Sequence, residues 1–139
     1  MEEPIAYTEA SWDRLRSYPT SPLPPDHPWP TRENLTLRLY STPLGCEHLA
    51  FSIGHLKPGQ SVEHHRHDKA EEVYVLIQGH CQIRVGERVI DAKPLDAFRV
   101  PAETYRSVYN HTNEDCWWLF MGAPIDEYLE NRDYNPPKE

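Results

Sequence analysis

One stretch of the sequence combines histidines and carboxylates at a spacing that suits metal binding or proton transfer. Residues 59–79 are GQSVEHHRHDKAEEVYVLIQG. His65 and His67 stand two positions apart, so on a strand their side chains share a face, because side chains alternate with period two. Glu72, at the start of the next predicted strand, can meet both histidines across the strand pair. Two imidazoles and a carboxylate on one inward face suit Fe, Mn, Ni, Co or Zn.

The segments around this stretch alternate between short strand-like runs and turn residues. Glycine and proline provide most of the turns. Short strands at close spacing with such turns indicate an all-β barrel or sandwich. The predicted strands are residues 35–40, 49–56, 61–67, 72–77, 81–85, 88–92, 97–100, 105–110 and 117–121.

The chain has 14 prolines, and their placement divides it. Residues 18–30, YPTSPLPPDHPWP, cannot form a helix or a central strand, because proline lacks the amide hydrogen and fixes its backbone angle. We expect an extended arm there, preceded by a short helix at 8–16, and a surface helix in the tail at 124–132. The chain then divides into a helix and proline-rich arm at 1–30 and a single barrel domain at 31–139.

The composition excludes several classes of function. The chain's 139 residues suffice for one domain. With 14 Lys and Arg against 22 Asp and Glu, the net charge is -8, and an acidic surface repels nucleic acid. No apolar run is long enough to span a bilayer, and the N-terminus is acidic where a signal peptide is basic, so we expect a cytoplasmic protein without a membrane partner. Three cysteines without metal-ligand spacing favour buried thiols in a reducing compartment: Cys46, Cys81 and Cys116.

The 59–79 stretch resembles the first motif of the cupin superfamily. That motif is Gly, five residues, His-x-His, three or four residues, Glu, six residues, Gly. The six-residue gap before the last glycine selects Glu72 over Glu71 as the inward carboxylate. The resemblance extends over residues 49–122 and implies an antiparallel jelly-roll barrel with a metal in its mouth. The motif positions are filled by Gly59, His65, His67, Glu72 and Gly79.

The second cupin motif is where this sequence departs from the resemblance. The family pattern is Gly, five residues, Pro-x-Gly, two residues, His, three residues, Asn. Pro101 and Asn110 match, whereas Leu95 and Glu103 replace the glycines and Arg106 replaces the histidine. The resemblance implies that this histidine is normally a metal ligand. A guanidinium stays protonated and offers only donors, so it cannot coordinate a metal.

Three hypotheses account for Arg106. In the first, His65, His67 and Glu72 hold a divalent metal with open positions, and Arg106 clamps an anionic group of the substrate. In the second there is no metal: Arg106 pairs with Glu72, a histidine acts as general acid or base, and Arg106 stabilises developing negative charge. In the third the ionic cluster only fixes the barrel geometry, although buried charges without a function are costly.

Further side chains could take part in the site. Tyr74 is in phase with Glu72, so its hydroxyl can hydrogen-bond a substrate or a site residue, or the ring is ordinary core. His64 is out of phase with the ligand face. Three other histidines are candidates for a replacement ligand. His80 and His111 are expected near solvent, and His55 could reach inward but is expected at a strand end.

The resemblance does not fix the reaction, because cupins host many activities. The leading interpretation is an enzyme acting on a small anionic metabolite, of the lyase, isomerase, cyclase or oxygenase class. The alternative is a non-catalytic ligand-binding or sensing cupin.

The aromatic strand at 117–121 predicts a homodimer. Trp117, Trp118 and Phe120 make this strand bulky on both faces, so we expect it to be covered on both sides, with the proline-rich arm contributing. Sedimentation or light scattering of the full-length chain at micromolar concentration should give the mass of a dimer, and deletion of residues 1–30 should shift it towards the monomer. A full-length monomer contradicts the prediction.

Overall fold

The structure is a computed structural model of the chain. The predicted N-terminal helix and proline-rich arm, and the predicted tail helix beyond residue 124, lie outside the described residues. Where the structure describes the chain, no helix is long and apolar enough to cross a membrane. The described residues are 36–39, 41–124 and 134–135.

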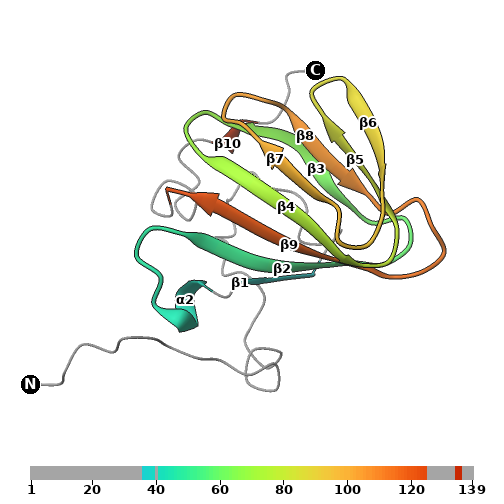
Figure 1. The fold of residues 1–139 in the computed structure, drawn as a ribbon, viewed down its shortest axis with the longest axis horizontal. Coiled ribbons are helices and arrows are strands. Elements are labelled where there is room, and N and C mark those ends of the chain that lie inside the picture. The colour runs from blue at the N-terminus through green and yellow to red at the C-terminus, as the bar shows by residue number, and fades with distance from the viewer. Residues whose placement is uncertain (1–35, 40, 125–133, 136–139) are drawn as a thin grey trace, which may run out of the picture.

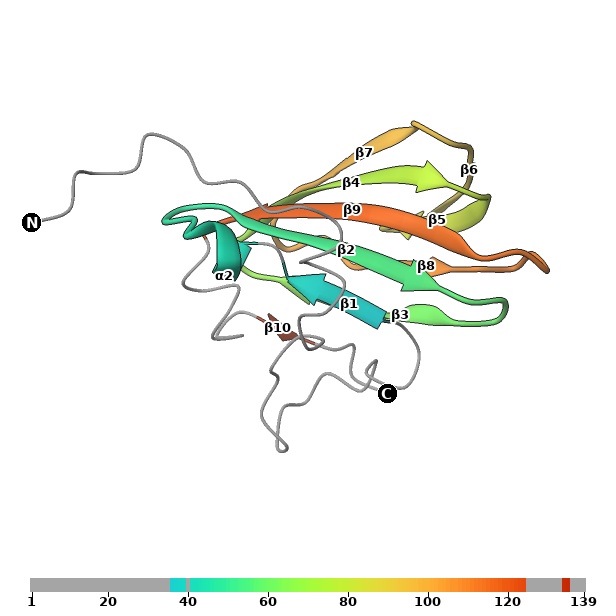
Figure 2. The same ribbon diagram turned by 90° about the horizontal axis from the view of Figure 1, so that it is seen from below.

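The described residues form two antiparallel five-stranded sheets (Figures 1 and 2). The order in the first sheet is β1 (Thr36–Leu39), β2 (Ala50–Leu56), β9 (Cys116–Ala123), β4 (Glu71–Gln78) and β7 (Ala97–Val100). The order in the second sheet is β10 (Tyr134–Asn135), β3 (Ser61–His67), β8 (Arg106–Tyr109), β5 (Cys81–Val85) and β6 (Arg88–Ala92). The described helix content is a single turn, α2 (Ser41–Leu44). The predicted all-β antiparallel fold is confirmed.

The core lies between the two sheets, because the inward side chains of both are predominantly apolar. In β2 and β9, buried and half-buried positions alternate along the strand, as expected when one face covers a core. Trp118 is fully buried, whereas its neighbour Trp117 on the opposite face is only half-buried. The central cluster consists of Leu56, Val62, Tyr74, Leu76, Cys81, Ile83, Ala92, Val108, Cys116, Trp118 and Phe120.

Strand register brings the candidate site residues of the two sheets to one end of the barrel. β9 lies between β2 and β4, and its residue Gly122 lies opposite Glu72. Cys116, the first residue of β9, lies at the other end of this strand. In the second sheet β3 pairs with β8, so that His65 lies opposite Arg106. Glu72 therefore comes from one sheet, and His65 with Arg106 from the other.

The turn between β4 and β5 requires glycine for two reasons. Gly79 has a positive φ of 86°, a conformation that L side chains rarely adopt. A Cβ there would also lie 2.6 Å from the Asp115 carbonyl oxygen and 2.9 Å from Cys116 Cβ. Gly86, in the turn between β5 and β6, shares the positive φ, at 60°, but a Cβ at this glycine would meet nothing within 4 Å.

Alanine substitutions at these two glycines test how much the close approach of Gly79 to Asp115 and Cys116 matters for stability. Gly86→Ala should cost roughly 1–2 kcal/mol of unfolding free energy, because only the left-handed backbone penalises it. Gly79→Ala should cost roughly 2–4 kcal/mol, because overpacking against Asp115 and Cys116 adds to that penalty. Urea denaturation of both variants measures the difference. Equal losses would mean that the turn can move away from β9 without cost.

Candidate active site

The histidines of β3 follow the predicted alternation. The side chains of His65 and His67 are each only 1% exposed, whereas His64, which directly precedes His65, is half-buried. His64 stacks on Tyr105, with ring centroids 5.1 Å apart and an interplanar angle of 18°. Burial, and to a smaller extent the charge of Arg84, lowers the pKa of His64. His65 and His67 therefore face the interior, and His64 does not.

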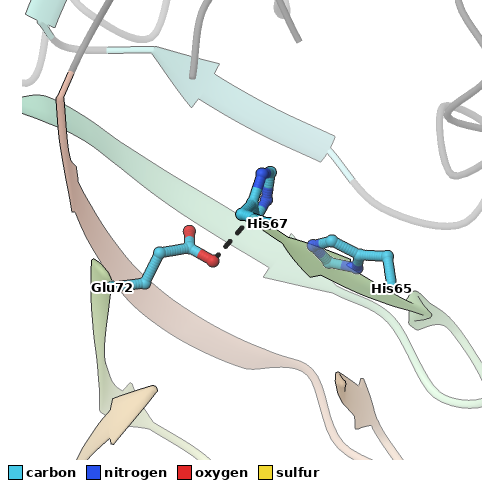
Figure 3. Close-up of side chains that lie close together, drawn as sticks. All are labelled: His65, His67 and Glu72. Atoms are coloured by element: carbon cyan, nitrogen blue, oxygen red, sulfur yellow. Dashed lines mark ion pairs between the residues drawn. The ribbon is translucent and has the colours of Figure 1, made fainter. Parts of the chain in front are cut away.

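Glu72 joins the two inward histidines from the facing sheet (Figure 3). Its side chain is 1% exposed, and its Oε1 lies 3.7 Å from His67 Nε2. The rings of His65 and His67 meet edge to face, with centroids 5.0 Å apart. One ligand atom from each of the three residues lies within 4.8 Å of the others. Adjacent Glu71 is exposed instead and pairs with Arg99.

Arg106 is wholly buried in the same cluster. Its side chain has no exposed surface, and its Nη1 lies 3.5 Å from Glu72 Oε1. Nη2 donates a hydrogen bond to the Pro101 carbonyl oxygen at 3.4 Å. Nε and Nη1 have no hydrogen-bond partner among the described residues. Nη1 therefore has an ion pair but no hydrogen bond, and an acceptor placed against these two nitrogens would be favourable, because a buried charged donor without a hydrogen bond is costly.

Tyr74 holds the carboxylate from the same strand. Its hydroxyl donates a hydrogen bond to Glu72 Oε1 at 3.1 Å. The ring is 2% exposed and packs edge to face on Phe120 and Trp118, with centroids 4.6 and 6.3 Å away. Burial raises the pKa of Tyr74 well above its ordinary value, with the Glu72 charge as the next cause. Tyr74 is therefore a neutral donor that positions Glu72.

The five side chains of this cluster lie within the segment that a family model recognises. The model that matches is that of the cupin domain, over residues 52–122. This chain belongs to the cupin family. No curated protein matches the sequence.

Solved structures agree with this cupin fold. TT1209 from Thermus thermophilus is 26% identical, with a TM-score of 0.61 over 67% of this chain and 86% of that one. A cupin protein from Bacteroides fragilis is 18% identical, with a TM-score of 0.64 over 87% and 86%. A putative sugar phosphate isomerase from Acidithiobacillus ferrooxidans is 20% identical, with a TM-score of 0.61 over 64% of this chain and 58% of that one.

The backbone supports the alignment of the second cupin motif. Leu95 and Glu103 occupy the two positions where the pattern has glycine, and both have positive φ, 74° and 67°. Only a few per cent of non-glycine residues adopt such angles. The cupin therefore keeps the left-handed backbone of both turns without glycine, and Arg106 occupies the position of the pattern's histidine.

The other histidines of the barrel lie away from the cluster. His80 and His111 are exposed. His55 Nε2 lies 2.8 Å from Asp115 Oδ2, and its ring stacks on Trp117 with centroids 4.1 Å apart. Among the described residues, the candidate metal ligands are thus the two imidazoles and one carboxylate already given. The Pro101 carbonyl contact was missed at the sequence level, because a backbone acceptor leaves no signal in residue type.

The two histidines and Glu72 suit a divalent transition metal, but Arg106 would compete with that metal for the Glu72 carboxylate. Two imidazoles and a carboxylate, all buried and converging, are the ligands that such metals prefer. The carboxylate oxygen nearest His67, however, is also the one that Arg106 approaches. The predicted roles of these residues as ligands or catalysts stay predictions.

Neighbouring glutamates on β4 allow a matched test of the buried pair. Glu72→Gln should lower the free energy of unfolding by roughly 3–5 kcal/mol, because it leaves the buried Arg106 without an opposite charge. Glu71→Gln breaks only the exposed pair with Arg99 and should cost less than about 1 kcal/mol. Urea denaturation in excess chelator measures both without a metal contribution. Similar losses would show that the Glu72–Arg106 contact carries little stability.

Proposed function

We propose that this cupin is an enzyme that binds a small anionic metabolite against Arg106, beside His65, His67 and Glu72. The observation that carries the proposal is the burial of Arg106 with two guanidinium nitrogens lacking hydrogen-bond partners among the described residues. A guanidinium keeps its charge when buried and matches the oxygens of carboxylate and phosphate. An anionic group of the substrate would supply the missing acceptors.

In the first form of the proposal, His65, His67 and Glu72 hold a divalent transition metal. Two imidazoles and one carboxylate leave coordination positions open. A metal bound there would supply Lewis-acid polarisation of a substrate oxygen. Tyr74 orients the carboxylate through its hydrogen bond, and Arg106 holds the anionic group of the substrate next to the ligands.

The second form is metal-free, and the Arg106–Glu72 contact favours it. Arg106 Nη1 lies 3.5 Å from Glu72 Oε1, so the guanidinium already provides this carboxylate with a positive charge. His65 or His67 then transfers a proton as general acid or base, and Arg106 stabilises negative charge that develops on the substrate.

The substrate class is consistent with the names of some structural neighbours, which share the fold alone. They include a sugar phosphate isomerase from Silicibacter pomeroyi at 17% identity and a predicted oxalate decarboxylase from Thermotoga maritima at 20%. Sugar phosphates and oxalate are anions. The proposed reaction class is therefore an isomerase, lyase, cyclase or oxygenase that acts on such a molecule. We also propose that the enzyme is a homodimer in the cytoplasm.

Anion binding tests the role of Arg106. Calorimetry with inorganic phosphate and with oxalate, at constant ionic strength, should detect binding to the full-length protein. Arg106→His should weaken that binding roughly 10- to 150-fold, which corresponds to the loss of a charged hydrogen bond. Arg99→His removes an exposed arginine and serves as the matched control, with binding unchanged. If neither anion binds, or if Arg106→His binds both as tightly as the original chain, the proposal is wrong.

Elemental analysis separates the two forms. The metal-bound form predicts stoichiometric metal in the purified protein, lost in His65→Ala, and a higher metal affinity in Arg106→His because a fourth ligand replaces a cation. The metal-free form predicts no stoichiometric metal, with phosphate and oxalate binding unchanged in chelator. Anion binding that depends on chelator-removable metal contradicts the metal-free form.

A further inference from the structure

A second pair of reactive side chains lies at the opposite end of the barrel. Cys81 begins β5 and Cys116 begins β9, so the two residues belong to different sheets. Their Sγ atoms lie 2.8 Å apart, and both residues are fully buried. Both are free thiols. Along β9, the opposite end at Gly122 faces Glu72, so the thiols are several residues of extended strand away from the Arg106 cluster.

The backbone fixes the distance between the two thiols. Cys116 lies opposite Leu56 in the ladder between β2 and β9, and Cys81 lies opposite Ala92 between β5 and β6. The Gly79 turn packs directly against Cys116, since a Cβ at this glycine would lie 3.0 Å from Cys116 Cα. The thiols are thus held together by the approach of two backbone segments.

Asn110 secures the segment that leads into Cys116. Its side-chain amide donates hydrogen bonds to the carbonyl oxygens of Leu56 and Glu114, at 3.0 and 2.7 Å. Its Oδ1 accepts hydrogen bonds from the backbone and hydroxyl of Thr112. Asn110 is itself fully buried. These hydrogen bonds therefore fix the turn before β9 as far as Glu114, two residues before Cys116.

The two thiols are chemically unequal. The hydrogen bond shared with Cys116 lowers the pKa of Cys81. The same contact, together with burial, raises the pKa of Cys116. A thiolate is the nucleophile in thiol chemistry, so we expect Cys81 to react first with an oxidant and Cys116 to react with the oxidised Cys81.

We propose that Cys81 and Cys116 are a peroxide-oxidised pair that forms a disulfide between the two sheets. The Cys81 sulfur attacks one oxygen of hydrogen peroxide, the O–O bond breaks, and the released hydroxide takes the Cys81 proton to form water. The Cys116 sulfur then attacks the Cys81 sulfenic acid, the S–O bond breaks, and the departing hydroxyl takes the Cys116 proton as a second water. Two thiols lose two electrons, and peroxide is reduced to two waters.

The disulfide would join the sheets at the end of the barrel away from Arg106. It closes a loop from residue 81 to residue 116, which restricts the unfolded chain and stabilises the folded one. Because both thiols are fully buried, peroxide reaches them only when the adjoining turns open locally, so the reaction is slow. Exchange with a small thiol restores the reduced pair.

The test uses the full-length protein treated with hydrogen peroxide. After denaturation and alkylation, the number of alkylated thiols should fall from three to one, since the chain has three cysteines. Non-reducing peptide mapping should recover the peptides of Cys81 and Cys116 as one linked species, which dithiothreitol separates. The melting temperature of the oxidised protein should rise by roughly 10 °C.

Single serine variants provide the controls. Cys46→Ser should still form the linked species with the same rise in melting temperature, whereas Cys81→Ser and Cys116→Ser should form none. Three alkylated thiols after peroxide treatment of the folded protein overturn the proposal, as does a disulfide that includes Cys46. The test does not depend on the proposed function, because neither phosphate nor oxalate binding enters it.

Discussion

The cluster depends on one carboxylate oxygen, Oε1 of Glu72, because polar side chains of both sheets contact this atom. Tyr74 donates a hydrogen bond to it from the same strand, at 3.1 Å. Arg106 Nη1 and His67 Nε2 approach it from the facing sheet, at 3.5 and 3.7 Å. A buried carboxylate is unfavourable without such partners. The inward direction of Glu72, rather than of its exposed neighbour Glu71, therefore determines which side chains can gather at this end of the barrel.

Most of this arrangement could be predicted from the sequence, because strand alternation is a local rule. Period two placed His65 and His67 on one face and His64 on the other, as the burial of the three side chains confirms. The predicted strand at 61–67 coincides with β3, whereas the strand at 117–121 extends further, to Cys116–Ala123. Strand ends are harder to predict, because they depend on partner strands and not on the residues alone.

What could not be predicted depends on contacts between segments distant in the chain. The cysteines were expected to be buried thiols, which holds for Cys81 and Cys116, but the sequence contains no indication that they touch. The same is true of the hydrogen bond from Arg106 to the Pro101 carbonyl oxygen. Leu95 shows the limit of turn prediction, since no residue preference would assign a positive φ to leucine.

The buried pair of Arg106 and Glu72 also governs how ligands would depend on one another. One positive and one negative charge cancel, so the pair is neutral by itself. A divalent cation bound by His65, His67 and Glu72 would add two positive charges, and an anion against Arg106 would add negative charge. In a medium of low dielectric constant each would lower the cost of the other. Cation and anion binding at this cupin would then be positively cooperative, and by thermodynamic reciprocity each would raise the affinity for the other by the same factor.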